Sequence, residues 1–507
     1  MHFDLSISSQ LIGALTPDIV VMVGAMLLML RAAWGHDSVE RQRSIGAEAI
    51  GVCVIAAAVI VYFMATKVTA TAGVVAVDNF RWITDLVLLT ATAGTIALSM
   101  DYNAREHILP GETHVLTLFA TSGMMILAAS RDLMLVFLGI ELMSIAVYVL
   151  AGMNRRSAKA AESSLKYFLL GAFSTGFLLY GIALVYGATA STNLHTIGTR
   201  IVELGITSSP MLLIGISLLL IGFAFKVAAA PFHMWAPDVY EGAPTPITAY
   251  MAAAVKAAAL AAFLRIWLEA FGAAFETWHA PIWWLAAITM VIGNIVALAQ
   301  KNIKRMLAYS SIAHAGYLLV VLTVGQALGT AAFLFYVAAY TLATLGSFGV
   351  VVALGSAGEP NNNIEDYAGL WTVRPWLSVA MAVFMLALLG FPVFGGMGFF
   401  AKWYVIQAAL QTVIPQTRIV VVLVLTSVIS AGYYLNVIMV MFMKPRPETA
   451  PVSAPVGAMT RWVVGLAAVL ILVFGVYPNA LVSLTHTPTA TLHPIQPAQS
   501  AAAAPQQ

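Results

Sequence analysis

The sequence predicts an all-α polytopic membrane protein with about fourteen transmembrane helices. Hydrophobic residues make up 61% of the 507-residue chain, charged residues make up only 9%, and the mean hydropathy is +0.91. A soluble globular domain carries roughly 25% charged residues. The low charge therefore excludes an ordinary soluble fold. The apolar residues also gather in windows long enough to cross about 30 Å of hydrocarbon.

The apolar windows follow one another along almost the whole chain. Their bounds are roughly 11–30, 46–65, 83–100, 114–129, 133–153, 164–186, 211–240, 247–270, 282–299, 303–325, 328–355, 376–409, 418–443 and 461–483. We interpret the first window as a retained span and not a signal peptide, because no Lys or Arg precedes it and Arg31 follows it. The tail 487–507 is rich in Pro, Ala and Gln, and is predicted to be disordered.

Loop charges predict the orientation of the chain. Alternate loops, starting with the one that holds Arg31, carry 15 Lys and Arg residues, whereas the other loops and the two termini carry 5. By the positive-inside rule, both termini face the outer side of the membrane. Arg265 lies near the outer end of its window, so its side chain is expected to reach the interface.

Composition also excludes several classes of function. The formal net charge is only +2, and no basic stripe is interleaved with aromatic residues, so a nucleic-acid partner is excluded. The single cysteine, Cys53, excludes a thiolate-bound iron–sulfur cluster and an internal disulfide within this chain. No phosphate-binding or dinucleotide-binding motif occurs, and no pattern for a metal or haem site is present.

Two windows are too long for one straight span and contain helix breakers. The seventh holds Pro231 soon after Lys226, and the twelfth holds Gly390, Pro392 and further glycines before Lys402. These windows are five apart, so they cross the membrane in opposite directions. This predicts two inverted five-helix repeats, helices 4–8 and 9–13, with broken helices 7 and 12 near a transport site. Alone, either proline is more typical of a simple structural kink, whereas the lysine near each break favours the functional interpretation.

The repeat divides the chain into five predicted parts. Residues 1–110 hold helices 1–3, residues 111–272 hold the first repeat, and residues 273–445 hold the second, inverted repeat. Residues 446–486 hold helix 14, and residues 487–507 form the tail.

Four ionisable residues lie well inside apolar windows: Glu141, Lys226, Lys256 and Lys402. A charge at the centre of a span costs at least about 2.5–3.5 kcal/mol, so such residues usually mark an ion or proton path. Counting residues along each window places all four at similar depth, as in a row across the membrane plane. An amine can change its protonation state when buried, which arginine cannot do. The alternative is a structural ion pair between Glu141 and one lysine.

Two histidines are further candidates for a proton relay. His233 directly follows the break at Pro231, and His314 lies inside the tenth window. A histidine titrates near neutral pH, although a single membrane histidine is as often held by a neighbouring carbonyl or hydroxyl group. Asp85, Arg131 and Asp132 lie near window ends, and we interpret them as interfacial anchors.

Three stretches resemble a known family. They are Pro231-Phe-His-Met-Trp-Ala-Pro-Asp-Val-Tyr-Glu-Gly-Ala-Pro-Thr-Pro246, Lys301-Asn-Ile-Lys-Arg-Met-Leu-Ala-Tyr-Ser-Ser-Ile-Ala-His-Ala-Gly-Tyr317 and Phe399-Phe-Ala-Lys-Trp403. All three resemble the antiporter-like membrane subunits of respiratory complex I (NADH:quinone oxidoreductase). The first two are most similar to the subunit N family, called subunit 2 in mitochondria.

The resemblance implies a proton-translocating subunit without redox centres, located in a bacterial inner membrane beside other antiporter-like subunits of the membrane arm. It implies that Glu141 and Lys226 form a coupled pair, that Lys256 is the central relay and that Lys402 is the terminal site, with His233 and His314 beside that axis. NADH, FMN, iron–sulfur clusters and quinone are then expected in other subunits of this oxidoreductase. Two alternatives stay open: a subunit of a cation/proton antiporter, and a structural scaffold of the membrane arm.

Overall fold

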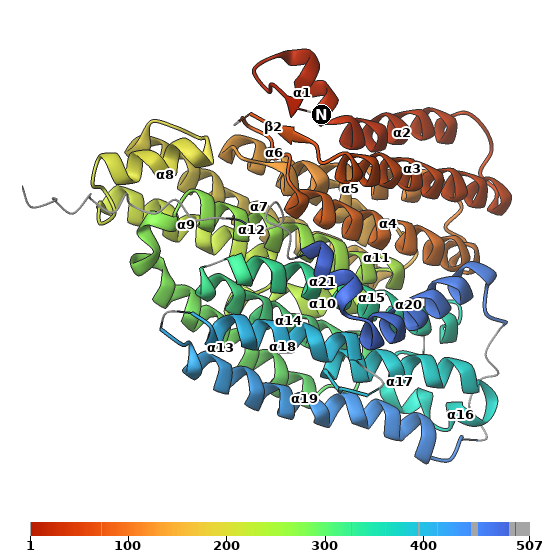
Figure 1. Cartoon of the computed structure of the whole chain (residues 1–507). Coiled ribbons are helices and arrows are strands. Elements are labelled where there is room, and N and C mark those ends of the chain that lie inside the picture. The colour runs from red at the N-terminus through yellow and green to blue at the C-terminus, as the bar shows by residue number, and fades with distance from the viewer. Residues whose placement is uncertain are drawn as a thin grey trace, which may run out of the picture.

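The chain folds into a bundle of long helices that lie side by side (Figure 1). The computed structural model describes residues 2–71, 73–325, 327–359, 361–393, 396–412, 414–447, 455–485 and 492. The predicted all-α polytopic class is confirmed, because twelve helices in these ranges are long and apolar enough to cross a membrane. The tail predicted to be disordered lies outside the described residues apart from Leu492.

The N-terminal part contains the first long helices. Its two short strands, β1 before these helices and β2 after α3, pair in parallel over two residues. The elements are β1 (His2–Phe3), α1 (Ser8–Ala14), α2 (Thr16–Ala33), α3 (Val39–Ala65), β2 (Thr69–Ala70) and α4 (Asn79–Glu106).

The middle of the chain contains the first broken segment. Its elements are α5 (Glu112–Ala129), α6 (Leu133–Ala151), α7 (Ala158–Thr189), α8 (Leu194–Glu203), α9 (Pro210–Lys226), α10 (Trp235–Gly242), α11 (Thr245–Tyr250), the π-helix η1 (Met251–Val255), α12 (Lys256–Glu269) and the short η2 (Gly272–Ala274).

The C-terminal part contains the second broken segment. Its elements are α13 (Phe275–Leu298), α14 (Ile303–Val324), α15 (Ala327–Leu354), the short η3 (Ile364–Tyr367), α16 (Leu370–Val373), α17 (Pro375–Leu389), α18 (Gly396–Leu410), α19 (Thr417–Met443), α20 (Ala458–Val476) and α21 (Asn479–Thr485).

Each predicted apolar window coincides with helix, and the two long windows are divided as predicted. The seventh window consists of α9 and α10 with an irregular stretch between them, and the twelfth consists of α17 and α18. The apolar helices α9 and α17 are shorter than the twelve long ones. The fourteen-span count, the inverted repeat and the five-part division stay predictions.

Polar side chains fix where several helices begin. Ser38, Asp78, Asp132, Ser157 and Asn302 each precede a helix and accept a hydrogen bond from a backbone N–H of its first turn. Such caps satisfy donors that the helix itself leaves free. The sequence therefore marks the membrane ends of α3, α4, α6, α7 and α14 with short polar residues.

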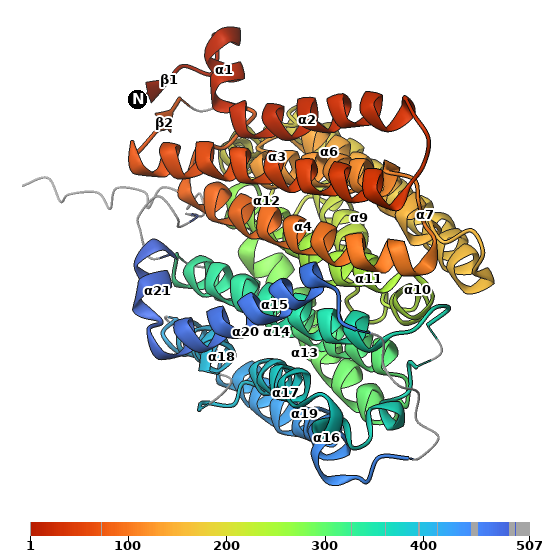
Figure 2. The ribbon, with the colours of Figure 1, turned by 90° about the vertical axis from the view of Figure 1, so that its right-hand side faces the viewer.

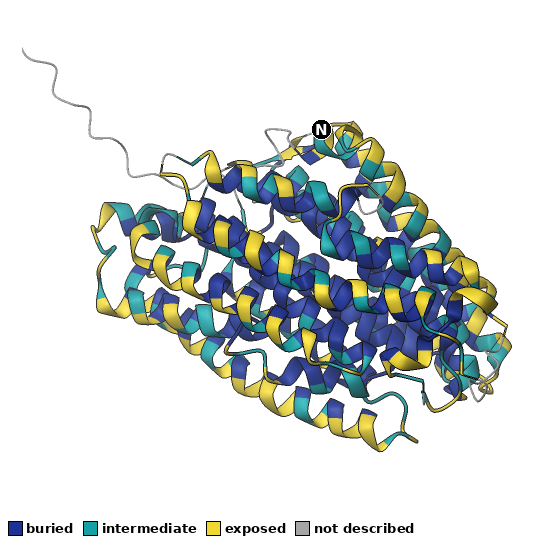
Figure 3. Ribbon diagram, turned by 90° about the horizontal axis from the view of Figure 1, so that it is seen from below, coloured by how far each residue is buried: buried dark blue, intermediate teal, exposed yellow. Residues whose placement is uncertain are grey.

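Burial divides the helices into an outer layer and an inner group. Two views place α2 and α3 at one edge of the bundle and α19 at the opposite edge (Figures 1 and 2). These outer helices expose many large apolar side chains, whereas the segment Thr245–Glu269 is buried throughout. Buried residues fill the middle of the bundle and exposed residues lie on its outside (Figure 3). Exposed apolar faces of this kind are suited to contact with lipid or with neighbouring membrane subunits.

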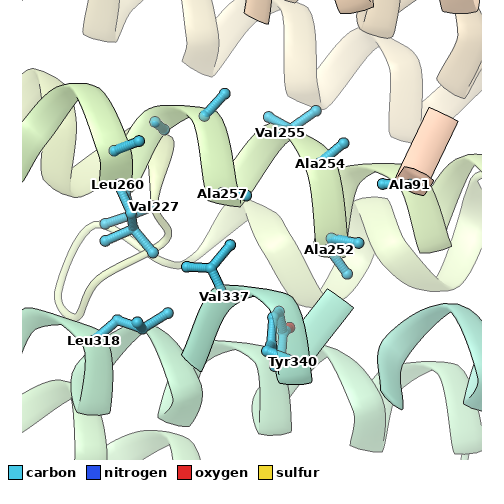
Figure 4. Close-up of a cluster of buried hydrophobic side chains, with 14 of the residues drawn as sticks. Ala91, Val227, Ala252, Ala254, Val255, Ala257, Leu260, Leu318, Val337 and Tyr340 are labelled. Carbon is cyan, nitrogen blue, oxygen red and sulfur yellow. The ribbon is translucent and has the colours of Figure 1, made fainter. Parts of the chain in front are cut away.

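Small side chains let the inner helices approach closely. Ala252 and Ala257 of the buried segment face a cluster that includes Val337 and Tyr340 of α15 and Leu318 of α14 (Figure 4). Close packing of small residues is the usual way in which membrane helices associate. This packing surrounds Lys256 with protein.

Candidate functional site

Glu141 and Lys226 lie on neighbouring helices, but they are not in ion-pair contact. Glu141 is on α6 and accepts a hydrogen bond from Thr175 of α7 at 2.8 Å. Lys226, the last residue of α9, donates to Ser144 Oγ at 2.8 Å and to Tyr148 Oη at 3.3 Å. Because Glu141, Ser144 and Tyr148 are spaced three and four residues apart, they share one face of α6. A serine hydroxyl therefore stands beside both predicted partners.

Lys226 lies at the carbonyl end of α9. The carbonyl end of a helix carries partial negative charge, which attracts a cation in the last turn. The break after α9 is also well satisfied: Trp235 Nε1 donates to the Phe225 carbonyl at 3.0 Å, and the Ala230 N–H donates to Thr289 Oγ1 at 3.0 Å. Backbone groups at the break therefore have hydrogen-bond partners within the fold.

Lys256 is the first residue after the π-helix η1, near the middle of the buried segment Thr245–Glu269. Its Nζ donates to the Ser311 carbonyl of α14 at 2.7 Å and also to the Ser311 hydroxyl. A π-turn inserts one extra residue into a helix and often occurs at functional sites. Here it sets the direction in which Lys256 points.

His314 forms the centre of a polar cluster between α14, α15 and α19. Its Nδ1 is 2.8 Å from Tyr336 Oη and its Nε2 is 3.2 Å from Tyr434 Oη. Tyr434 is also hydrogen-bonded to Ser310, the neighbour of the Lys256 partner Ser311. Side-chain hydrogen bonds therefore join His314 to Ser310, which is next to the residue of α14 that binds Lys256.

Lys402 lies on α18, beside the second break. Its Nζ donates to the Leu389 carbonyl, at the end of α17, at 2.8 Å and to Ser427 Oγ of α19 at 3.2 Å. The ammonium also lies 4.7 Å from the ring centre of Tyr317. Lys402 thus binds the carbonyl end of the half-helix α17 directly, whereas the ammonium of Lys226 binds hydroxyl groups of α6.

A small cavity joins Lys402 to His314. Its lining includes these two residues with Tyr336 and Tyr340. Beside it, Tyr317 Oη accepts from the Asn294 amide at 3.0 Å, and Tyr433 Oη donates to the other end of that amide at 2.9 Å. Hydroxyl groups and one imidazole therefore occupy the space between Lys256 and Lys402.

His233 lies apart from this cluster. It is half-buried in the turn before α10, its ring lies 6.5 Å from that of Tyr309 between centres, and its Nδ1 has no hydrogen-bond partner in the described chain. The structure thus brings His314, but not His233, into the polar cluster between Lys256 and Lys402.

The three membrane lysines, Lys226, Lys256 and Lys402, are all buried, with exposed fractions of 3%, 2% and 7%. Within the described ranges none of them forms a salt bridge to a carboxylate. The sequence-based alternative of a structural ion pair with Glu141 therefore finds no direct contact. Each amine is instead held by hydroxyl and carbonyl oxygens.

Two sequence interpretations are wrong, one on α12 and one on α4. Arg265 does not extend to solvent: it is fully buried and pairs with Asp78 and Glu269 at 2.8 and 2.9 Å. Asp85 is not an interfacial anchor, because it is fully buried beside Arg81 of the same helix. Opposite charges make this burial possible, and one of them, Asp78, is too distant in sequence to be recognised as a partner of Arg265.

Ion pairs outside the spans hold the loops at both ends. Burial opposes ionisation of Asp78, but Arg265, followed by Arg131, outweighs it and holds the pKa of Asp78 below its ordinary value. In the loop after α15, burial again opposes ionisation, but Lys304 at 2.8 Å holds the pKa of Glu359 below its ordinary value. Lys304 also donates to the Ala243 carbonyl at 2.7 Å, which ties α10 to this loop.

Sequence reasoning missed the hydroxyl groups that hold the lysines. They are Ser144, Tyr148, Ser311 and Ser427. Thr175, which binds Glu141, and Tyr434, which binds His314, were missed as well. Helical spacing from Glu141 would have found Ser144 and Tyr148, and Ser311 precedes His314 by three residues. The π-helix before Lys256 carries no sequence signal, since it consists of Met, Ala and Val.

Fold and polar cluster together define an antiporter-like polytopic membrane protein, with lysines at two helix breaks and one π-turn. Residues 130–430 match the family model described as NADH:quinone oxidoreductase/Mrp antiporter, TM. The chain belongs to the NADH-quinone oxidoreductase subunit N family. It is 51% identical to subunit N of Gemmatimonas aurantiaca, over 97% of this chain and 96% of that protein. It is 50% identical to subunit N of Trichlorobacter lovleyi, over 76% and 80%.

Solved structures agree with this assignment. A chain of respiratory complex I from Thermus thermophilus with bound aureothin is 35% identical and gives a TM-score of 0.78, covering 92% of this chain and 98% of that one. A chain of the Mrp complex from Dietzia gives a TM-score of 0.82 at 20% identity, with 95% and 97% covered. The second likeness concerns the fold alone. The chain is therefore a multi-pass membrane protein with bacterial relatives.

Proposed function

We propose that this chain is the proton-translocating subunit N of a bacterial NADH:quinone oxidoreductase. One observation carries the proposal: three lysines are buried in the membrane bundle, and each is bound by neutral oxygen atoms only, as far as the described residues extend. A purely structural lysine gains little from such a position, because a buried charge without a counter-ion is costly. An amine that takes up and releases a proton removes that cost during part of a cycle.

In this proposal Glu141 and Lys226 form the loading pair. The Glu141 carboxylate attracts the Lys226 ammonium, and the Ser144 hydroxyl beside both residues can accept from the amine. When the distance between the two charges changes, their attraction changes, and the proton held by Lys226 becomes easier or harder to remove. Coupling to quinone reduction elsewhere in the complex supplies that movement.

Lys256 is the central relay and Lys402 is the terminal site. The hydrogen bonds from Lys256 to Ser311, and from Ser310 through Tyr434 to His314, lead toward the cavity that His314 shares with Lys402. His314 can carry a proton on either ring nitrogen, which suits a position between two amines. His233 is the least supported member of the relay, because its Nδ1 lacks a partner in the described chain.

The remaining parts of the proposal concern the setting of the chain. Both termini lie on the outer side of the bacterial inner membrane, and other antiporter-like subunits lie beside this one. This subunit has no redox role of its own. NADH, FMN, iron–sulfur clusters and quinone belong to other subunits. Within the described residues, no group of three His, Cys, Asp or Glu side chains could hold a metal ion.

Replacing Lys256 by methionine tests the proposal. Lys256→Met keeps a similar volume but cannot hold a proton, so the assembled complex is expected to lose most NADH-driven proton pumping in vesicles. Lys67→Met, at an exposed position after α3, is the matched control and is expected to pump normally. Pumping that survives in Lys256→Met with unchanged assembly favours the structural-scaffold alternative and rejects the relay.

The antiporter alternative predicts a different result. The family model and the fold likeness both include Mrp antiporters. An antiporter subunit gives sodium-dependent proton exchange in vesicles without NADH. Exchange of this kind by the purified assembly, without NADH-quinone reductase activity, would contradict the proposed membership of a respiratory oxidoreductase.

A further inference from the structure

A second cluster of titratable side chains lies among the three N-terminal long helices, apart from the membrane lysines. Asp18 is in the first turn of α2, and Arg81 and Asp85 are one turn apart on α4. All three are buried, with exposed fractions of 2%, 0% and 0%. We call Asp18 and Asp85 the aspartate pair.

Arg81 is the only cation that contacts the aspartate pair in the described ranges. Its Nη2 donates to Asp18 Oδ2, and its Nε donates to Asp85 Oδ2 at 3.3 Å. Its Nη1 donates to the backbone carbonyls of Ala76 at 2.8 Å and Ala14 at 3.4 Å. One guanidinium therefore faces two carboxyl groups, and most of its donors are used.

No other charged group compensates for the second carboxyl. The nearest further cation that acts on Asp85 is Arg265 of α12, which is already held by Asp78 and Glu269. Helix α15 has no acidic or basic residue, and the acidic and basic residues of α3 and α5 lie in the first halves of those helices, away from the start of α2. With both aspartates ionised, a fully buried cluster would carry one uncompensated negative charge.

The remaining oxygen atoms point to the same imbalance. Asp18 Oδ1 and Asp85 Oδ1 are both buried and have no hydrogen-bond partner in the described chain. A carboxylate normally accepts several hydrogen bonds when buried, and an unsatisfied charged oxygen is strongly unfavourable. A proton on one of these atoms removes the excess charge and converts one unsatisfied acceptor into a donor.

We propose that the aspartate pair binds one exchangeable proton at neutral pH, chiefly on Asp85. Asp18 is the better place for the negative charge, because the first turn of α2 carries the positive end of the helix dipole. The pair titrates as one unit, since two acids share one guanidinium. This proton site is independent of the proposed function of the membrane lysines.

Infrared spectroscopy of the assembled complex, with aspartate Cγ isotopically labelled, tests this proposal. A carbonyl band of a protonated aspartic acid is expected at neutral pH in the unmodified chain, and it should shift in heavy water. Absence of any labelled aspartic-acid band at neutral pH would overturn the proposal without recourse to a variant.

Two substitutions assign the band. In Asp85→Asn and in Asp18→Asn, one carboxylate remains beside one guanidinium, so both variants are expected to lose the band completely. Asp37→Asn, at an exposed loop position, is the control and should keep it. A band that persists in Asp85→Asn overturns the assignment. If Asp85→Asn fails to assemble, the assignment is also overturned, because an amide has nearly the same shape and the same zero charge as a protonated Asp85. Pumping enters neither readout, so the two proposals fail separately.

Discussion

At the scale of single residues, hydroxyl groups decide how the buried amines are held. Sequence spacing identified Lys226, Lys256 and Lys402 as intramembrane lysines, and all three are buried. Helical spacing from Glu141 could have found Ser144, but the contacts of Lys256 and Lys402 could not be identified, because Ser311 and Ser427 come from other helices. The burial of Arg265 and Asp85 could not be predicted either. Each has an opposite charge four residues away on its own helix, but the further partners of these ion pairs, Asp78 and Asp18, are distant in sequence.

Gly171 allows Tyr148 to reach Lys226. A Cβ atom at this position of α7 would come within 2.0 Å of Tyr148 Oη. Gly171→Ala is therefore expected to displace Tyr148, to destabilise the chain by about 1–3 kcal/mol and to weaken pumping in vesicles. Gly176→Ala on the same helix is the control, because a Cβ there meets nothing within 4 Å and should stabilise by about 0.5–1 kcal/mol. Equal melting temperatures and pumping in the two variants would contradict a role for Tyr148.

Glu359 makes stability dependent on pH through Lys304. Because its folded pKa lies below the ordinary value of 4.5, the stabilisation is complete above that pH and is lost as the pH falls through the folded pKa. Thermal unfolding of the purified complex should show a smaller loss on acidification in Glu359→Gln than in the unmodified chain. The control, Glu365→Gln, removes an exposed ion pair with Lys444 and should leave the pH profile unchanged. A profile that is the same in all three proteins would argue against this role.

At the scale of elements, irregular backbone marks each lysine. Lys226 and Lys402 lie at helix breaks that Pro231 and Gly390 predicted, since proline and glycine interrupt helices. Gly390 ends α17 with φ of 81°, a conformation that favours glycine. The π-helix η1 was not predictable, because Met251–Val255 consists of ordinary helix-compatible residues and its shape follows from packing.

Inserting one alanine after Ala253 adds a residue that the π-turn does not already absorb. One residue more turns the rest of the segment by about 100° relative to α14, since an α-helix has 3.6 residues per turn. Lys256 would then point away from Ser311, and pumping is expected to be lost even though the lysine is present. Ser311→Ala removes only the hydroxyl acceptor and keeps the carbonyl, so a partial reduction is expected. Full pumping in the insertion variant would exclude a role for the direction of Lys256.

At the scale of the whole molecule, composition and hydropathy were sufficient for the membrane class. The apolar windows matched helices because the hydrocarbon thickness sets both the length and the polarity of a span. Orientation is a prediction from loop charge alone. The mutual arrangement of the helices was beyond the sequence, because the exposed apolar faces of α2 and α19 and the buried faces of α14 and α15 have similar hydropathy.

Single-cysteine labelling tests the predicted orientation. In a Cys53→Ala background, Arg156→Cys in the α6–α7 loop and Lys67→Cys in the α3–α4 loop should react from opposite sides. A membrane-impermeant maleimide added to intact cells is expected to label the second variant and not the first. The reverse pattern would invert the topology and place both termini inside.

The complete enclosure of Thr245–Glu269 by other helices has one consequence for experiments in different bilayers. Acyl chains do not touch Lys256, so a change of lipid composition reaches this amine only by shifting the protein walls around it. Detergent and bilayer preparations that keep the surrounding helices in place should therefore give the same infrared spectrum and the same hydrogen-exchange rate for Lys256. The outward sides of α2, α3 and α19, in contrast, should respond to each new environment.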